Sequence, residues 1–184
     1  MLQAGHTGFI GRIWNGKKVG NTQGIANVYK ARDLGYSKVD GSFVPCHDPS
    51  CSRPEYQMES ALERLKRGNA SVDTIWIYLP SDWPNAHLKT DREMLLALVD
   101  KAVAMGQRVG VASTAKVFES LFGESFNDLP PVPLWWTEQT GHPDNTGFVP
   151  CDGWLEPAMH EYREFKGVGL CGLTHYSLSH FDPF

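Results

Sequence analysis

Four cysteines are the residues of this sequence best suited to covalent or metal chemistry. Cys46 and Cys51 flank a short proline-containing loop, and two cysteines held by such a turn can reach disulfide distance. Cys151 and Cys171 remain as a second pair. Zinc is the competing interpretation, but structural zinc usually takes two closely spaced ligand pairs, and the second pair here is widely spaced. The spacing therefore favours two disulfides, and with them an extracellular compartment, over metal ligands or free thiols.

An N-glycosylation motif agrees with secretion, whereas the start of the sequence does not resemble a signal peptide. Asn69-Ala70-Ser71 is an N-glycosylation acceptor at Asn69, on a predicted helix-to-strand turn where a glycan would be tolerated. Residues 1–6 lack the basic segment, apolar core and cleavage site of a signal peptide. No apolar stretch approaches the ~20 residues that a membrane-spanning helix needs. We expect a secreted domain with no membrane contact.

Sequence motifs for several other kinds of chemistry are incomplete or absent in this chain. Residues 11–18 approach a phosphate-binding P-loop, but the last position is Lys where Ser or Thr should bind magnesium, so a turn is the better interpretation. There is no His-Glu-x-x-His zinc motif, no Gly-x-Ser-x-Gly elbow and no histidine spacing suited to a metal. The net charge of -4, without a basic run, argues against nucleic acid. The sequence predicts no cofactor, no metal and no nucleic-acid partner.

Strand-like and helix-like segments alternate along the chain. Its 184 residues, 41% of them hydrophobic and 21% charged, fit a single globular domain over 1–184. Strands are predicted over 9–14, 39–44, 74–79, 109–112, 132–137, 159–162 and 169–176, and helices over 22–34, 54–67, 91–105 and 115–122. This alternation implies an α/β fold with a mostly parallel sheet, either a barrel or an open sheet. A dinucleotide site has no support, because no Gly-x-Gly-x-x-Gly follows a strand.

Six segments in the same order carry a family resemblance that covers nearly the whole chain. They are residues 4–12, 39–46 (ending Pro-Cys), 74–80 (Thr-Ile-Trp-Ile-Tyr-Leu-Pro), 133–136 (Pro-Leu-Trp-Trp), 153–157 (Gly-Trp-x-x-Pro) and 170–172 (Leu-Cys-Gly). Together they resemble the lysozymes of glycoside hydrolase family 25, in particular those of nematodes and amoebae. The resemblance implies an irregular (β/α) TIM-like barrel. It also implies that the first strand of that barrel, which supplies one catalytic Asp, is missing from this sequence.

The positions at which the family carries catalytic acids hold other residues here. The family's central strand has Asp-x-Glu, which Tyr78 and Pro80 replace, and Tyr176 stands where its last strand has Asp. Glycoside hydrolysis needs paired carboxyl groups. Proline cannot transfer a proton, and tyrosine, with an ordinary pKa of ~10, is a poor acid near neutrality. The resemblance therefore implies a pseudoenzyme. We interpret the acids left near strand ends, Asp40, Asp82 and Glu138, as structural or solvated.

The central strand makes a prediction about side-chain direction. Because alternate residues of a strand face opposite sides, Trp76, Tyr78 and Pro80 should face the barrel interior, and Ile75, Ile77 and Leu79 the surrounding helices. Six aromatic residues are predicted on or near the strand ends at the mouth: Trp76, Tyr78, Trp135, Trp136, Trp154 and Tyr176. Aromatic faces suit sugar rings, but rings can also simply fill an interior that has lost its acids. Core filling is the preferred interpretation.

Three functions fit these observations. The preferred one is a catalytically inactive lysozyme-like domain that serves as an extracellular structural protein. Such a domain would self-associate into a homo-oligomer or filament by strand addition beside residues 9–14. The second function is a non-catalytic glycan-binding module. The third is an active peptidoglycan muramidase whose acids lie elsewhere in the chain.

Overall fold

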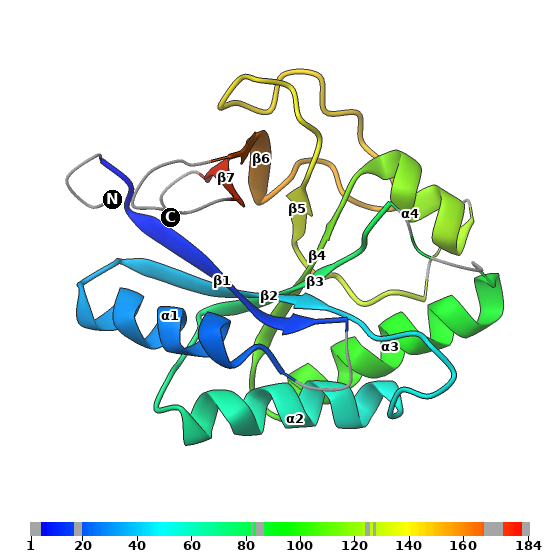
Figure 1. Cartoon of the computed structure of the whole chain (residues 1–184). Coiled ribbons are helices and arrows are strands. Elements are labelled where there is room, and N and C mark those ends of the chain that lie inside the picture. Colours follow the sequence, from blue (N-terminus) through cyan, green and yellow to red (C-terminus); the bar gives the residue numbers. More distant parts are fainter. Residues whose placement is uncertain are drawn as a thin grey trace.

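A single seven-stranded sheet organises the molecule in the computed structural model, which describes residues 5–16, 20–81, 83, 87–123, 126, 128–167 and 175–181. The strands pair in chain order: β1 (Gly8–Asn15), β2 (Lys38–Val44), β3 (Thr74–Tyr78), β4 (Arg108–Ser113), β5 (Leu134–Trp136), β6 (Met159–Lys166) and β7 (His175–His180). Strands β1 to β6 are parallel, and β7 runs antiparallel to β6. The sheet curls into a half-barrel (Figure 1), which confirms the predicted α/β class and mostly parallel sheet.

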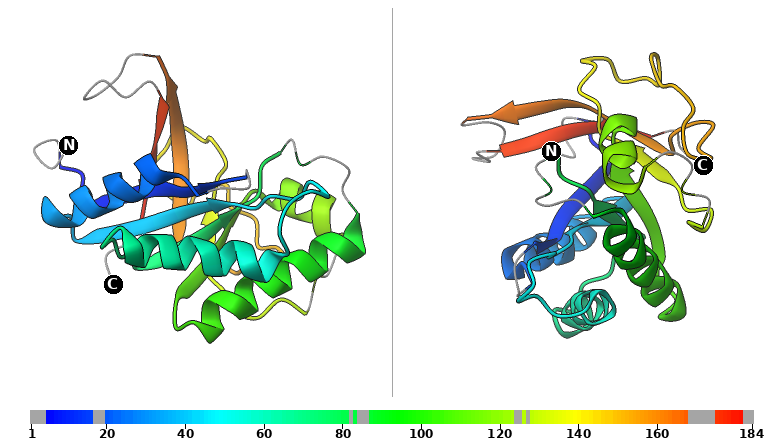
Figure 2. Two further views of the ribbon diagram at one scale, coloured as in Figure 1. Left: turned by 60° about the horizontal axis from the view of Figure 1, so that its bottom comes forward. Right: turned by 90° about the vertical axis from the view of Figure 1, so that its right-hand side faces the viewer.

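In the part of the chain that the structure describes, four helices alternate with the first five strands. They are α1 (Thr22–Asp33), α2 (Pro54–Arg67), α3 (Leu88–Ala104) and α4 (Ala115–Phe122). Figure 2 shows α1, α2 and α3 side by side on one face of the sheet, while the β6–β7 hairpin rises from the opposite side. The half-barrel therefore has a convex face covered by helices and a concave inner face.

Local signals explain where the helices begin. Asn21 caps α1 by accepting from the Gly24 amide, Thr114 caps α4 in the same way, and Pro54 opens α2 at its predicted position. Helix α3 begins three residues before the predicted start at Asp91. The reason is that the Asp91 carboxylate reaches back to the His87 amide, 2.7 Å away, so this acid lies inside the first turn and not ahead of it.

The C-terminal strands differ most from the prediction. Strand β6 continues past the predicted end at 162 to Lys166, and the last strand is His175–His180, where 169–176 was predicted. Residues 168–174 lie outside the described part of the chain. Beyond Arg163, β6 pairs with β7 alone, and the Phe165 and Tyr176 rings stack across the hairpin at 4.8 Å. Antiparallel pairing thus stabilises this end of the sheet.

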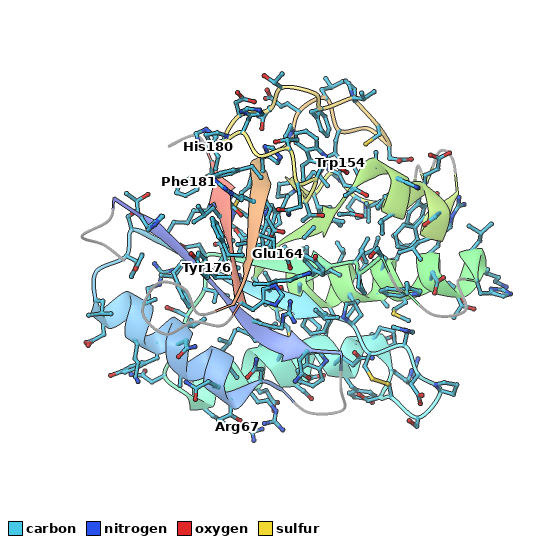
Figure 3. All side chains as sticks on the ribbon, turned by 45° about the horizontal axis from the view of Figure 1, so that its top comes forward. Arg67, Trp154, Glu164, Tyr176, His180 and Phe181 are labelled. Carbon is cyan, nitrogen blue, oxygen red and sulfur yellow. A yellow bond between two sulfur atoms is a disulfide. The ribbon has the colours of Figure 1, made fainter. Side chains whose placement is uncertain are left out.

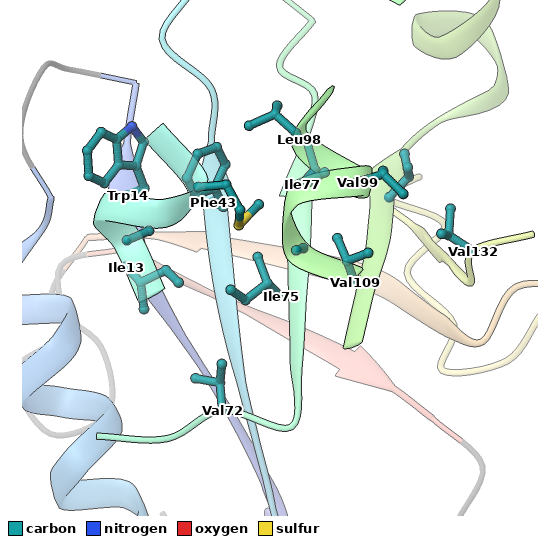
Figure 4. Close-up of a cluster of buried hydrophobic side chains, with 14 of the residues drawn as sticks. Ile13, Trp14, Phe43, Val72, Ile75, Ile77, Leu98, Val99, Val109 and Val132 are labelled. Carbon is teal, nitrogen blue, oxygen red and sulfur yellow. The ribbon is translucent and has the colours of Figure 1, made fainter. Parts of the chain in front are cut away.

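The main core lies between the helices and the convex face of the sheet. Figure 4 shows side chains from neighbouring strands meeting those of α3, among them Ile75, Ile77 and Leu98. Ile75, Ile77 and Leu79 are each at most 3% exposed and belong to this core, as predicted for the helix-facing side of the central strand. Gly24 of α1 packs so closely on β1 that a Cβ there would lie 1.8 Å from the Arg12 carbonyl oxygen.

One side chain spans the two edge strands of the half-barrel. Phe181, which follows β7, belongs with Ile10 to the apolar cluster of the inner face, and a Cβ built on Gly8 would lie 3.0 Å from its ring. The Lys38 ammonium sits 5.1 Å from the centre of the same ring. In the part of the chain that the structure describes, the strand ladders run only from β1 through β7 and do not return to β1.

Cys46 and Cys51 form a disulfide, which confirms the first predicted pair. Gln57, 1% exposed on α2, fixes this loop by accepting from the Cys46 amide and donating to the Cys46 and Ser52 carbonyls. The second predicted pair stays a prediction, because Cys171 lies outside the described residues. Within those residues, none of the helices is long and apolar enough to cross a membrane.

Candidate functional site

The inner face of the half-barrel carries an aromatic cluster, where the central strand was predicted to face the barrel interior. Trp76 of β3, Ala112 of β4, Trp135 of β5 and Met159 of β6 form its buried part, and Tyr78 packs against them. The strand register explains the grouping, since Tyr78 pairs with Ala112, Ala112 with Trp135, and Trp135 with Met159. The predicted inward direction of Trp76 and Tyr78 is confirmed. Pro80 follows the strand and is partly buried.

The three rings of this inner-face cluster touch edge to face. Trp135 lies between the other two, with its ring centre 6.0 Å from that of Trp76 and 6.3 Å from that of Tyr78, at interplanar angles of 67° and 69°. Trp76 is 2% exposed and Trp135 4%, whereas Tyr78 is partly exposed. The Nε1 of Trp135 is buried without a hydrogen-bond partner in the described structure. Two of the three rings therefore fill space, and only Tyr78 offers a surface to solvent.

The structure places the other three predicted aromatic residues elsewhere. Trp136 stacks on His160 at 4.1 Å. Trp154 packs on Phe118 of α4 and donates to the Val132 carbonyl (2.7 Å), and Tyr176 stacks on Phe165 in the hairpin. Figure 3 shows the labelled Trp154 beside α4, well apart from Tyr176 on β7. Of the six aromatic residues predicted at the barrel mouth, three thus form one cluster (Trp76, Tyr78 and Trp135), and the other three lie elsewhere.

Asp40 is the buried acid of the inner face near the start of the strands. Its side chain is 0% exposed and accepts from the Thr74 amide at 3.0 Å and from the Trp76 indole at 2.9 Å. The Lys38 ammonium lies 3.7 Å from the same carboxylate oxygen that Trp76 contacts. Burial raises the pKa of Asp40, and the hydrogen bond from Trp76 and the charge of Lys38 oppose that rise. These contacts support the structural role predicted for this residue.

Glu161 is a second buried acid, which the sequence analysis did not single out. It is 8% exposed on β6 and accepts from the Gln139 amide at 2.8 Å and from the Ser177 hydroxyl at 2.7 Å. Burial raises its pKa, and the two hydrogen bonds oppose the rise. The only sequence signal was its place in a predicted strand two residues after Met159, and hence on the same face.

The two acids lie toward opposite ends of the strands. Asp40 is level with Thr74, at the beginning of β3, because the next inward residue, Ser42, pairs with Trp76. Glu161 lies beyond Met159, which is level with the end of β3 through Trp135 and Ala112. Among the described residues, the inner face therefore carries two buried acids that are hydrogen-bonded separately, at different levels along the strands.

The remaining predicted site residues lie outside this cluster. Asp82 is outside the described residues, and Glu138 is exposed after β5. Asn69 is exposed in the turn after α2, where it adopts a positive φ of 49°. Across the ranges that the structure describes, no three His, Cys, Asp or Glu side chains are grouped so that they could hold a metal ion.

Solved structures with a similar fold define the class to which this architecture belongs. The muramidase from Acremonium alcalophilum matches all of this chain and 86% of its own, with a TM-score of 0.70 and 9% identity. The modular autolysin LytC from Streptococcus pneumoniae matches 96% of the chain with a TM-score of 0.71 and 14% identity, and the Clostridium perfringens spore cortex lytic enzyme SleM matches 86% with 0.61 and 16%. This chain spans 41% of LytC and 53% of SleM. The half-barrel therefore has a muramidase-like fold.

Sequence comparison identifies the family. The model of the family described as Lysozyme-like protein 1 matches residues 1–162, and this chain belongs to that family. Lysozyme-like protein 5 of Caenorhabditis elegans is 29% identical over 172 residues, which cover 93% of this chain and 79% of the relative. The predicted resemblance to lysozymes is confirmed at this level.

Proposed function

We propose that this chain is a lysozyme-like domain without hydrolase activity. The observation that carries the proposal is the position of Tyr78, at the carboxyl end of β3 and turned to the inner face, edge-on to Trp135. In family 25 lysozymes an acid would project into the barrel mouth from this position. A phenol here, followed by Pro80, supplies neither a general acid near neutral pH nor a carboxylate that stabilises an oxocarbenium ion.

The remaining acids of the inner face support the same proposal. Each oxygen of Asp40 and of Glu161 accepts a hydrogen bond from a protein donor. The separation of the two residues along the strands also differs from the facing arrangement of glycosidase acids. General acids in glycosidases are, however, often buried glutamic acids with a raised pKa, as Glu161 is. Glu161 is thus the residue through which the alternative function, an active muramidase, would work.

The test is a turbidity assay on purified bacterial cell walls, with the Acremonium alcalophilum muramidase as the positive control. We expect no clearing by the wild-type chain, and none by a Tyr78→Asp/Pro80→Glu double variant, because two acids on one strand do not rebuild the whole site. Clearing by the wild type that disappears in Glu161→Gln would establish the muramidase and end the proposal of inactivity.

Glycan binding is the second candidate for the inner face. Tyr78, partly exposed beside the buried Trp135, is the observation in its favour. The burial of Trp76 and Trp135 favours core filling, since a sugar cannot stack on a covered ring. A glycan array with the wild type and a Tyr78→Ala variant separates the two. Binding that this variant loses would assign the site, and absence of binding would leave the rings as core.

Secretion and the family 25 barrel belong to the same proposal. The Cys46–Cys51 disulfide supports an extracellular compartment, and the parallel order of β1 to β6 supports a barrel-type ancestor. Glycosylation of Asn69 and the Cys151–Cys171 bridge stay predictions. Expression through a secretory pathway, followed by non-reducing peptide mapping, would test both.

Self-association into an oligomer or filament is the structural role that we propose. Any strand addition would use residues 8–12 of β1, because Asn21 already donates to Ile13 (2.9 Å) and Gly20 bridges Trp14 on the second half of the strand. Sedimentation over a range of concentrations tests this. A mass that rises with concentration supports assembly, and a constant monomer mass refutes it.

A further inference from the structure

His160 of β6 occupies an unusual polar environment for a buried side chain. It is 0% exposed, yet both of its ring nitrogens face main-chain carbonyl oxygens. Nδ1 contacts the Asp144 carbonyl, and Nε2 lies 2.8 Å from the Glu138 carbonyl. Thr140 adds a hydroxyl 3.5 Å from Nε2. Both carbonyls come from the chain that follows β5.

The two carbonyls determine how many protons the ring must carry. A carbonyl oxygen only accepts hydrogen bonds, and a neutral imidazole has a single N–H, so it can satisfy one carbonyl and must turn a lone pair toward the other. The imidazolium form has two N–H groups and satisfies both. Trp136, stacked 4.1 Å from the His160 ring at an interplanar angle of 21°, presents an aromatic face that also favours a cation.

The carbonyls belong to residues 138–144, which have few other attachments to the sheet. The Gly141 amide donates to the Tyr162 carbonyl at 2.8 Å, and Gln139 donates to Glu161. Three consecutive residues of β6 thus hold this segment, and among them His160 makes the most contacts, with Glu138, Thr140 and Asp144. Residues 138, 139 and 141–144 are exposed, so the segment covers His160 with little packing of its own.

We propose that His160 holds the 138–144 segment against β6 as a doubly protonated imidazolium and that loss of one proton releases the segment. The segment is then a pH-dependent cover on one edge of the sheet, attached in mildly acidic solution and loosened as the solution becomes alkaline. This inference does not depend on whether the domain is catalytic, because it concerns the side of β6 that faces Trp136 and not the inner face.

The charged and titratable groups around the ring agree with this direction. They are Glu138, His142 and Asp144 in the covering segment, Glu161 and Tyr162 beside His160 on β6, and His180, its partner across the β6–β7 ladder. Hydrogen bonds from Thr146 lower the pKa of Asp144, which keeps a negative charge near the ring. Burial raises the pKa of Glu161, and the hydrogen bond that it accepts from Gln139 of the covering segment opposes that rise.

The test is an NMR titration of the 184-residue chain between about pH 5.5 and about pH 8.5, on either side of the range in which imidazole titrates. At the acid end we expect two ring N–H groups on His160 and a protected Gly141 amide. At the alkaline end we expect one ring N–H and a protection factor for Gly141, corrected for intrinsic exchange, that is lower by about tenfold or more.

Two variants make the assignment specific. His142→Gln changes a histidine of the same segment whose ring the proposed contact does not use, and it should titrate like the wild type. His160→Phe keeps the ring stack on Trp136 but has no N–H, and it should show low Gly141 protection at both ends. A single ring N–H on wild-type His160 at the acid end, or Gly141 protection that does not change with pH, would overturn the proposal even if His160→Phe fails to fold.

Discussion

The Trp76 indole nitrogen donates a 2.9 Å hydrogen bond to the Asp40 carboxylate, joining the inner-face side chains of β2 and β3. The other oxygen of Asp40 accepts from the Thr74 amide. Trp76 in turn meets Trp135 edge to face, so the carboxylate fixes the orientation of the first ring in the aromatic cluster. A buried acid is thus used to position apolar side chains.

Removing this acid should destabilise the fold. Asp40→Ala leaves the Trp76 and Thr74 N–H groups buried without acceptors, and we expect the free energy of unfolding to fall by about 3 kcal/mol. Asp40→Asn keeps one acceptor oxygen, so its loss should be about 1 kcal/mol. Urea denaturation followed by tryptophan fluorescence measures both. Equal losses in the two variants would show that the hydrogen bonds to Asp40 do not matter.

The same position gives a pH dependence with a definite sign. Burial raises the pKa of Asp40 in the folded state, so the stability linked to its proton is fully present below the unfolded-state value, about 3.9, and is lost as the pH rises through the folded-state pKa. The deficit of Asp40→Asn relative to the wild type should therefore shrink as the pH rises over that range. Unfolding curves at matched acidic pH values measure this, and a deficit that grows instead would contradict the proposed burial cost.

The Cys46–Cys51 bridge should contribute modestly because it closes a short loop. We expect Cys46→Ser/Cys51→Ser to lower the free energy of unfolding by about 2 kcal/mol. A reducing agent should lower the stability of the wild type by a similar amount. Any further loss when the double variant is reduced would report the predicted Cys151–Cys171 bridge. Wild-type stability that does not respond to reduction would contradict the contribution of the first bridge.

Gly24 should tolerate no side chain. A methyl group there would lie 1.8 Å from the Arg12 carbonyl oxygen, a main-chain atom of β1 that cannot move aside without breaking the strand. Gly24→Ala should therefore cost more than about 3 kcal/mol, despite the better helix propensity of alanine. Gln23→Ala, one residue earlier on the exposed side, is the matched control and should change stability by less than about 0.5 kcal/mol. Equal melting temperatures for the two variants would refute the close approach.

The sequence predicted the elements that depend on local chemistry. Helix α2 has its predicted bounds because Pro54 opens it and Gly68 follows it, and β3 is apolar on both faces as a central parallel strand should be. A last strand was predicted, but neither its bounds nor its antiparallel direction, because this pairing depends on partners across the hairpin, such as Phe165 and Tyr176. The hydrogen bonds by which Gln57 fixes the Cys46–Cys51 loop could not be predicted either, because the path of that loop determines the three main-chain atoms that Gln57 contacts.

In the candidate site, too, the residues predicted correctly were those that depend on local sequence patterns. Alternation along one strand placed Trp76 and Tyr78 correctly, and strand order brought Trp135 beside them. Trp136, its immediate neighbour, points to the other side of β5, as alternation requires, so the two adjacent tryptophans could not both belong to one cluster. Glu161 is a buried acid whose hydrogen-bond donors, Gln139 and Ser177, lie in other segments of the chain. No local sequence pattern predicts such partners.

The contact of Phe181 with β1 has a consequence for the order of folding. The helices and parallel strands form from segments near one another in the chain, whereas Phe181 must find Gly8 across almost the whole described sequence. Closing so long a loop costs conformational entropy, and the contact of a single ring, without strand hydrogen bonds, contributes little free energy to offset that cost. The curvature of the sheet should therefore be completed late in folding and be the first feature lost on heating, before the helical layer melts.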